Sequence, residues 1–402
     1  MRAMMISNRT FTGVHILQGM LVVLLLLSLS ACASGSGILG GGDWQAGGLQ
    51  QRHIRTLEVN PKDPQKLYAG DAQGGIFVSA DAGQHWVEQN SGIPLPNAIH
   101  TLAFNIAGTK LFAATDTGLF VSTDGAQHWN AMSSSASGLP SDSYTTVTFD
   151  VNAQHTVYVG TIHHGVFVST DDGANWSSAS SGLPQNAEIH SLALDTDHHQ
   201  LWAATSLGVY RSDTRSISWQ ALNSGLPATI VVNTVVPAAA SGGMQGLVYA
   251  GTNHGVFRSL NAGENWTINS ESLSGTSIHA ILVDFRSSNA STVYVGTDVG
   301  VFRSVDNGQD WGGSASGLPR GKPVYALVVG ANDYTQLYAA VDSSGIYLFP
   351  GTSGGIDPSR ILPFLLIVLF FFLLYRLTWR RRNRQRDLLK PERIIETPPS
   401  ER

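Results

Sequence analysis

A short triplet of glycine, an aliphatic residue and Phe or Tyr recurs seven times along this chain, and it restricts the possible folds more than any other feature. The triplet glycines are Gly75, Gly118, Gly165, Gly208, Gly255, Gly300 and Gly345, at spacings of 43, 47, 43, 47, 45 and 45 residues. Each triplet follows a strand-like run such as residues 67–70 (LYAG), and another run such as residues 99–104 (IHTLAF) lies further upstream. Units of this length that contain several short strands are typical of propeller blades.

Six triplets are followed by eight residues that begin with serine and end with tryptophan. Three copies fit the pattern S-x-D-x-G-x-x-W, two are slightly altered, and residues 212–219 (SDTRSISW) keep only the two ends. The motif residues are Ser79, Asp81, Gly83, Trp86, Asp124, Trp129, Ser169, Asp171, Gly173, Trp176, Asn261, Gly263, Trp266, Ser304, Asp306, Gly308 and Trp311. Serine and aspartate side chains bond to turn backbone, and glycine adopts angles that other residues resist, so we expect a structural role for this motif.

The pattern resembles the Asp-box, or BNR, repeat family. The resemblance implies an all-β chain that folds as a seven-bladed β-propeller, here over residues 43–350. The seventh unit has no box and no tryptophan, whereas Trp44 has no box before it. We therefore expect an N-terminal strand to complete the last blade and close the ring, which would remove exposed sheet edges.

The N-terminal segment, residues 1–32, reads as a signal peptide because residues 20–29 form an apolar run of signal-peptide length after two arginines. The run ends in Leu29-Ser30-Ala31-Cys32, which is similar to a bacterial lipobox with Cys32 as the lipidated residue. An ordinary signal peptide or an uncleaved anchor is the alternative. Residues 33–42 are rich in glycine and serine and are expected to be a linker.

The C-terminal segment contains a long apolar run, and residues 361–379 are predicted to be one transmembrane helix. Residues 380–402 form a basic tail that begins with an arginine cluster, which the positive-inside rule assigns to the cytoplasm. Residues 351–360 are the predicted linker before the helix. The expected location is a bacterial cell membrane, with the propeller outside the cytoplasm.

The charge of the central region argues against nucleic acid as a partner. Residues 33–360 contain 13 basic and 25 acidic residues, and a general nucleic-acid binder needs a basic face to neutralise phosphates. The chain has one cysteine, so the propeller has no internal disulfide to stabilise it.

Polar residues occupy one equivalent place in the seven innermost strands, directly after the first apolar residue. They are Arg55, His100, Thr145, His190, Asn233, His279 and Tyr325, and we expect them to form a polar ring around the mouth of a central channel. His163, His164 and His254 fall in turns on the same face. These residues, Thr145 apart, are our candidates for contact with a partner or ligand, and hydrogen bonding between blades is the alternative. We predict no metal site and no cofactor.

Asp-box propellers include enzymes and binding proteins, so the function class rests on which residues are present. The early Arg-Ile-Pro motif of sialidases is absent. Xyloglucanase-type hydrolases resemble this chain in repeat pattern, and carboxylates such as Asp116 and Asp298 keep a glycoside hydrolase as the alternative. The chain also looks like the exported photosystem II stability/assembly-factor group, which is non-catalytic. We expect a non-catalytic membrane-anchored propeller that binds a protein or glycan outside the cell.

Overall fold

The computed structural model describes residues 43–349, except residues 133, 135, 239–245, 269–270, 285–291 and 331–335. The predicted signal peptide, Cys32, both linkers, the transmembrane segment at 361–379 and the basic tail lie outside the described residues. Within the part of the chain that the structure does describe, no helix is long and apolar enough to span a membrane.

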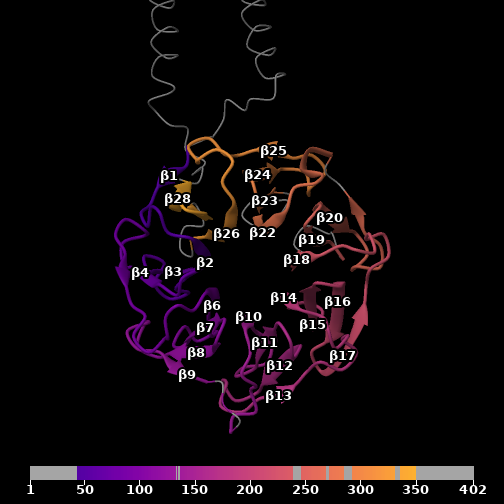
Figure 1. Ribbon diagram of the computed structural model, residues 1–402. Coiled ribbons are helices and arrows are strands. Elements are labelled where there is room, and N and C mark those ends of the chain that lie inside the picture. Colours follow the sequence, from indigo (N-terminus) through magenta and orange to yellow (C-terminus); the bar gives the residue numbers. More distant parts are fainter. Residues whose placement is uncertain are drawn as a thin grey trace, which may run out of the picture. The chain divides into compact units, whose positions relative to one another are not determined.

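Seven four-stranded antiparallel sheets are arranged around a common axis (Figure 1). Blade 1 comprises β2 (Ile54–Val59), β3 (Leu67–Asp71), β4 (Ile76–Ser79) and β5 (Val87–Glu88); blade 2 comprises β6 (Ile99–Phe104), β7 (Leu111–Thr115), β8 (Gly118–Ser122) and β9 (Asn130–Ala131). Blade 3 comprises β10 (Tyr144–Phe149), β11 (Val157–Thr161), β12 (Val166–Ser169) and β13 (Ser177–Ser178); blade 4 comprises β14 (Ile189–Asp195), β15 (Gln200–Thr205), β16 (Gly208–Asp213) and β17 (Ser216–Ala221).

The remaining blades follow in the same order from the inner to the outer strand. Blade 5 comprises β18 (Val232–Pro237), β19 (Val248–Thr252), β20 (Gly255–Ser259) and β21 (Thr267–Ile268); blade 6, after the 3-10 turn η1 (Glu271–Leu273), comprises β22 (Ile278–Asp284), β23 (Thr292–Thr297), β24 (Gly300–Ser304) and β25 (Gly312–Gly313). Blade 7 comprises β26 (Val324–Val329), β27 (Leu337–Val341) and β28 (Gly345–Phe349). Its outer strand is β1 (Gln45–Ala46), which pairs Gln45 with Leu348. The all-β, seven-bladed architecture predicted from the repeats is confirmed.

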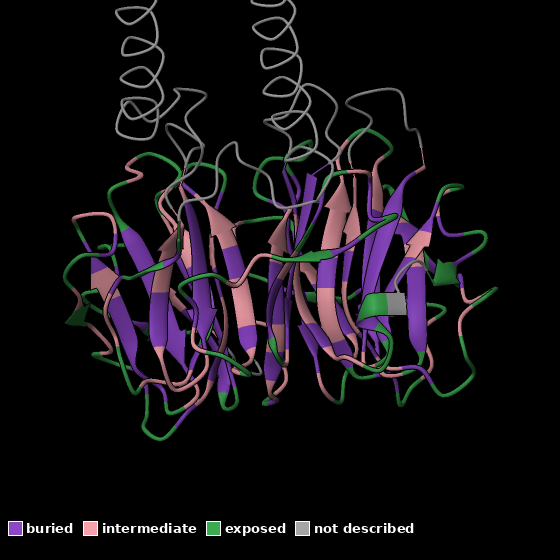
Figure 2. Ribbon diagram, turned by 90° about the horizontal axis from the view of Figure 1, so that it is seen from above, coloured by how far each residue is buried: buried purple, intermediate pink, exposed green. Residues whose placement is uncertain are grey.

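The second strand is buried along its whole length in six blades, and in blade 4 it is buried except at Gln200, because neighbouring blades cover both of its faces. Figure 2 shows this buried band through the middle of the sheets, with exposed loops at both edges. Side chains must be small where the blades approach most closely. A Cβ added to Gly70 would lie 2.5 Å from Ile99 of the next blade, which accounts for a glycine in the middle of a strand.

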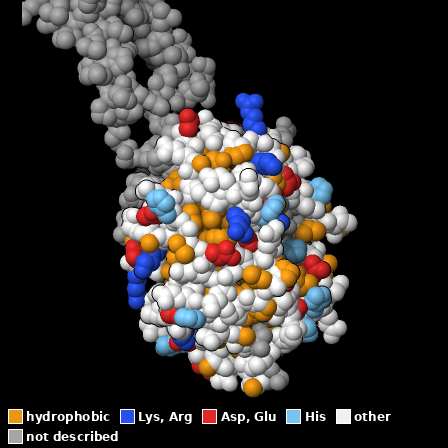
Figure 3. Space-filling view, turned by 60° about the vertical axis from the view of Figure 1, so that its left-hand side comes forward, with side chains coloured by type: hydrophobic (Ala, Val, Ile, Leu, Met, Phe, Trp, Pro, Cys, Tyr) orange, Lys and Arg blue, Asp and Glu red, His pale blue; other side chains and the backbone are white. Residues whose placement is uncertain are grey.

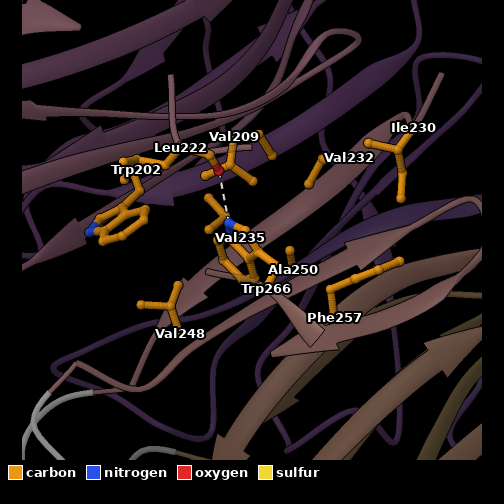
Figure 4. Packing of buried hydrophobic residues seen from close by; sticks show 11 residues of the cluster. Trp202, Val209, Leu222, Ile230, Val232, Val235, Val248, Ala250, Phe257 and Trp266 are labelled. Atoms are coloured by element: carbon orange, nitrogen blue, oxygen red, sulfur yellow. Dashed lines mark hydrogen bonds between the residues drawn. The ribbon is translucent and has the colours of Figure 1, made fainter. Parts of the chain in front are cut away.

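Over the described residues, the core is divided into seven apolar clusters, and each lies between two adjacent blades. Figure 4 shows the cluster between blades 4 and 5, where Trp202 and Val209 of one blade meet Val235 and Trp266 of the other. The Trp266 indole donates to the carbonyl of Leu222, 2.8 Å away, across the same interface. One cluster joins blades 7 and 1, so apolar packing continues around the ring.

The box turn has a closed set of hydrogen bonds, seen clearly in blade 3. The hydroxyl of Ser169 accepts the N–H of Gly173 at 2.9 Å and donates to Asp171 at 2.7 Å. Asp171 also accepts the side-chain and backbone N–H of Asn175, and these bonds lower the pKa of Asp171 to about 2. The indole of Trp176 donates to the carbonyl of Gly173. Each box residue therefore serves the geometry of the turn.

The Ser-Gly pair that follows most box tryptophans connects one blade to the next. The N–H of Trp266 donates to the carbonyl of Ser224 at 2.9 Å, and Gly225 has φ of 90°. A Cβ on Gly225 would lie 2.1 Å from the carbonyl oxygen of Trp266. The same approach joins Gly92 to Trp129, Gly138 to Trp176, Gly182 to Trp219 and Gly317 to Trp44. We call this contact the latch.

Candidate functional site

Each of the seven inner strands contains a β-bulge, and the bulged residue is the polar position singled out in the sequence. The register shifts between Ile54 and Thr56 in blade 1, and an equivalent shift occurs in every other blade. A bulged residue leaves the ladder and its side chain is re-aimed. The seven bulged residues are Arg55, His100, Thr145, His190, Asn233, His279 and Tyr325. We call them the rim.

Three consecutive rim residues are used to join blades. The hydroxyl of Thr145 donates to the carbonyl of Ile189, which begins the next inner strand. His190 Nδ1 lies 2.9 Å from the carbonyl of Val232, and the amide of Asn233 donates to the carbonyl of Ile278 at 2.9 Å. We call Thr145, His190 and Asn233 the bridging half of the rim. The sequence predicts that His190 and Asn233 contact a partner or ligand. In the structure, each of these side chains bonds to a carbonyl of the next blade.

The other four rim residues, from blades 6, 7, 1 and 2, contact one another or their own blade. The rings of His279 and Tyr325 lie 4.8 Å apart, and the guanidinium of Arg55 lies 3.9 Å above the Tyr325 ring. Among the described residues, no carboxylate forms an ion pair with Arg55, and Arg55 is exposed. Stacking fixes the guanidinium plane and leaves its N–H edge available for a ligand. We call His279, Tyr325, Arg55 and His100 the open half of the rim.

The two aspartates considered for catalysis hold turns and rim histidines in place. Asp116 accepts the backbone N–H of Ala98 and lies 2.7 Å from His100 Nε2. Asp298 accepts the N–H of Ser277 and lies 2.7 Å from His279 Nε2. In both carboxyl groups, each oxygen already has a partner in its own blade. This arrangement orients the imidazole rings of the open half.

The turn histidines lie apart from this group. His163 and His164 both contact Asp142, at 2.8 and 2.7 Å, and the Asp142 side chain is only 3% exposed. Burial alone would raise the pKa of Asp142, but hydrogen bonds from the two histidines outweigh it, so the pKa is lowered. His254 is exposed, and among the described residues no hydrogen bond or ion pair joins its side chain to another candidate.

Histidine–carboxylate pairing is too common here to mark a site by itself. Ten of the described histidines lie within ion-pair distance of a carboxylate, on both edges of the blades. Figure 3 shows several such histidines beside acidic side chains on one face. Within the described residues, no group of three or more His, Cys, Asp or Glu side chains is placed to hold a metal ion. The stacked Arg55 and Tyr325 are what distinguish the open half.

Sequence reasoning missed Glu58 on the inner strand of blade 1. Its carboxylate accepts the N–H of Phe104 from the next blade at 3.3 Å, and burial raises the pKa of Glu58 to about 7. The signal was present in the repeats, because the equivalent residues in the next three blades are Ala103, Thr148 and Ala193. An alignment of these repeats would have shown that Glu58 is the one carboxylate at a position that is uncharged in the next three blades.

Comparison with known proteins supports the fold and leaves the activity open. No family model matches the chain, and no curated protein matches it in sequence. Solved propellers match it in structure. YCF48 from Cyanidioschyzon merolae has a TM-score of 0.56 and 16% identity over 77% of this chain and 98% of its own. A further structure shows YCF48 bound to a D1 peptide, with a TM-score of 0.59 and 15% identity.

Larger proteins contain similar propellers. The GH74 xyloglucanase from Xanthomonas campestris has a TM-score of 0.60 and 16% identity, covering 79% of this chain and 55% of the enzyme. The extracellular domain of a hybrid two component system from B. thetaiotaomicron has a TM-score of 0.61 and 16% identity, covering 77% of this chain and 39% of that one. The chain thus spans about half or less of these two proteins, and at such identity the likeness defines the fold alone.

Proposed function

We propose that this protein is a non-catalytic binding module, anchored in a bacterial cell membrane, that binds a protein or glycan partner outside the cytoplasm. The observation that carries the proposal is the open half of the rim. There, Arg55 is exposed and stacked on Tyr325, while the bridging half is occupied with bonds between blades. Only one side of the rim therefore has side chains free to make new bonds.

The chemistry of the open half suits recognition of a carboxylate or of hydroxyl groups. A stacked guanidinium offers two parallel N–H donors, and the neighbouring imidazoles of His100 and His279 are oriented by Asp116 and Asp298. The similar propellers fit this class of function, since YCF48 binds a D1 peptide and another is the extracellular domain of a two component system. These likenesses are analogies of fold.

The membrane attachment follows from the sequence at the two ends. Residues 361–379 are apolar enough to cross the bilayer, and the arginine-rich residues 380–386 fix the tail in the cytoplasm. Cys32 ends a lipobox-like segment and would add a lipid anchor. Both ends place the propeller outside. Treatment of intact cells with a protease tests this: a propeller digested without lysis supports the topology, and a fully protected one contradicts it.

The binding proposal is tested with two matched triple variants of the full chain. The open-rim variant carries Arg55→Ala, His100→Ala and His279→Ala, and the bridging-rim variant carries Thr145→Ala, His190→Ala and Asn233→Ala. Partners retained from native membranes after crosslinking are compared by mass spectrometry. We expect the open-rim variant to lose the partner while keeping its fold, and the bridging-rim variant to keep it. Retention of the same partner by the open-rim variant would exclude this site.

A glycoside hydrolase is the second candidate, favoured by the presence of several GH74 enzymes among the similar structures. Its acidic groups would be Asp116 and Asp298, although both already accept bonds from turns. Polysaccharide panels assayed with the wild type and with Asp116→Asn and Asp298→Asn decide this point. If the wild type hydrolyses a polysaccharide and either substitution abolishes that activity, the hydrolase function would replace the binding proposal.

A further inference from the structure

The rim lies at one edge of the blades, which we call the rim edge. This edge is formed by the connections from one blade to the next and by the turns between second and third strands. Its Lys and Arg residues are Arg52, Arg55, Arg320 and Lys322, which lie in the connection from β1 to β2, on β2, and in the connection from β25 to β26. The connections at 89–98, 132–143, 179–188, 222–231 and 269–277 contain no Lys or Arg. Cationic side chains on this edge are therefore confined to blades 7 and 1.

Three of these four cations have no acidic partner in the part of the chain that the structure describes. Arg52 forms ion pairs with Asp71 and Glu88. Arg55 contacts only the ring of Tyr325, and the side chains of Arg320 and Lys322 make no hydrogen bond or ion pair to a described residue. We call Arg55, Arg320 and Lys322 the basic strip. Its charges are available to an anionic ligand.

The connection into blade 7 also differs from its counterparts at the tip. The tip residues are Ser141-Asp142, Gln185-Asn186 and Ala228-Thr229 in three other connections, and Arg320-Gly321 in this one. Gly321 has φ of 63°, and no atom lies within 4 Å of an added Cβ, so the tip projects into open space. Arg320 is five residues before Tyr325, on which Arg55 stacks, so their Cα atoms are at most roughly 18 Å apart. One short segment of a ligand can therefore reach the whole strip.

Exposed apolar side chains lie on both sides of the basic strip. Val299 is 50% exposed in the turn between β23 and β24 of blade 6, and Leu95 is 58% exposed in the connection from β5 to β6. Blades 6, 7, 1 and 2 are consecutive in the ring (Figure 1). The order along the rim edge is thus an apolar residue, the basic strip and a second apolar residue.

We propose that the open half of the rim binds an acidic segment of a partner polypeptide, with its carboxylates on the basic strip and apolar side chains on Val299 and Leu95. The inference rests on the proposed function and adds the chemistry of the partner. Residues 33–360 contain 25 acidic and 13 basic residues, so an acidic partner is repelled by most of the surface and attracted to this strip. The guanidinium groups can each bind a carboxylate through two N–H donors.

The apolar residues favour a polypeptide over an anionic glycan. A chain of uronic acids offers carboxylates, but it has no aliphatic side chains to cover Val299 and Leu95. A peptide with acidic residues between apolar ones offers both kinds of group in the order that the rim edge requires.

The test selects ligands from a random dodecapeptide library displayed on phage, with the full-length protein in detergent as the target. A selected peptide is then labelled, and its affinity is measured by fluorescence anisotropy. The charge-reversed variant carries Arg320→Glu and Lys322→Glu. The matched control carries Lys62→Glu and Lys66→Glu, which changes the net charge equally at two exposed lysines on the opposite edge, between β2 and β3.

We expect the selected peptides to contain acidic residues between apolar ones. The charge-reversed variant should bind at least about ten-fold more weakly than the wild type, because two attractive contacts become repulsive, and the control should stay within about two-fold. Leu95→Ser and Val299→Ser should each weaken binding about three-fold through lost apolar contact. Raising NaCl from about 50 to about 500 mM should also weaken binding, since salt screens exposed charges.

Selected peptides without acidic residues, equal affinity for the wild type and the charge-reversed variant, or no enrichment of any peptide would overturn the inference. So would a polygalacturonate oligosaccharide that binds the wild type but not the charge-reversed variant while no peptide is enriched. Crosslinking in native membranes separates this inference from the proposed function. A partner lost from the open-rim variant but kept by the charge-reversed variant refutes the inference alone, whereas a partner kept by the open-rim variant refutes the proposed function.

Discussion

The latch glycines give a sharp test of how the blades are held together. In Gly225→Ala, the added Cβ would lie 2.1 Å from the backbone oxygen of Trp266, at a position with φ of 90°. The left-handed backbone costs a non-glycine residue roughly 1–2 kcal/mol, and forcing a methyl group against immobile backbone adds about 1–3 kcal/mol. The lower entropy of the unfolded chain returns about 0.4–1 kcal/mol. The net loss of stability is therefore about 3 kcal/mol.

Two other glycines separate these contributions. Gly321 has φ of 63° with no atom within 4 Å of an added Cβ, so Gly321→Ala should cost about 1 kcal/mol through the backbone alone. Gly313 has neither a positive φ nor a close neighbour, so Gly313→Ala should change stability by less than about 0.5 kcal/mol. Thermal unfolding followed by circular dichroism measures all three. The reasoning fails if Gly225→Ala unfolds at the same temperature as Gly321→Ala.

Three further predictions concern single side chains. Hydrogen bonds from Asn175 hold the pKa of Asp171 at about 2, so Asp171 stabilises the fold above pH 4 and this contribution is lost toward pH 2. The difference in Tm between wild type and Asp171→Asn should therefore shrink from pH 4 to pH 2. A difference in Tm that stays constant over this range would contradict the prediction. Burial raises the pKa of Glu58 to about 7, so wild-type stability should fall as pH rises from 4.5 through 7, and Glu58→Gln should remove that fall in a Tm–pH series. Trp266→Phe leaves the buried carbonyl of Leu222 without its donor and should cost about 1–3 kcal/mol in chemical unfolding; no loss would show that the bond is dispensable.

Much of the scaffold could be predicted because repeats report the same environment several times. The triplet glycines mark the third strand of each blade, and the box residues bond within their turns. The blade count came from the same pattern. The Ser-Gly pairs were visible as a recurrent motif, but their role was not, because it depends on how closely Gly225 approaches a tryptophan of the next blade.

The candidate site was predictable only as a set of equivalent positions. Sequence placed Arg55 and His190 in the same ring, yet one is exposed and the other bonds to Val232. That difference depends on which carbonyl the neighbouring blade presents, and no local pattern encodes it. The turn of blade 4 was hidden for a similar reason: its eight residues have the length of a box, and only the pairing of Asp213 with Ser216 shows that the path differs.

The central claim, that the open half of the rim binds a partner, is tested most directly by photocrosslinking in native membranes. A benzophenone amino acid is placed at Gln73 in one variant and at Val87 in another, so that Arg55 is kept in both. Gln73 is exposed in the turn after Asp71, which pairs with Ile54 at the start of β2, and Val87 is 61% exposed on the outer strand of the same blade. The account predicts one specific crosslinked species from position 73 and none from position 87. The same species from position 87, with none from position 73, would contradict it.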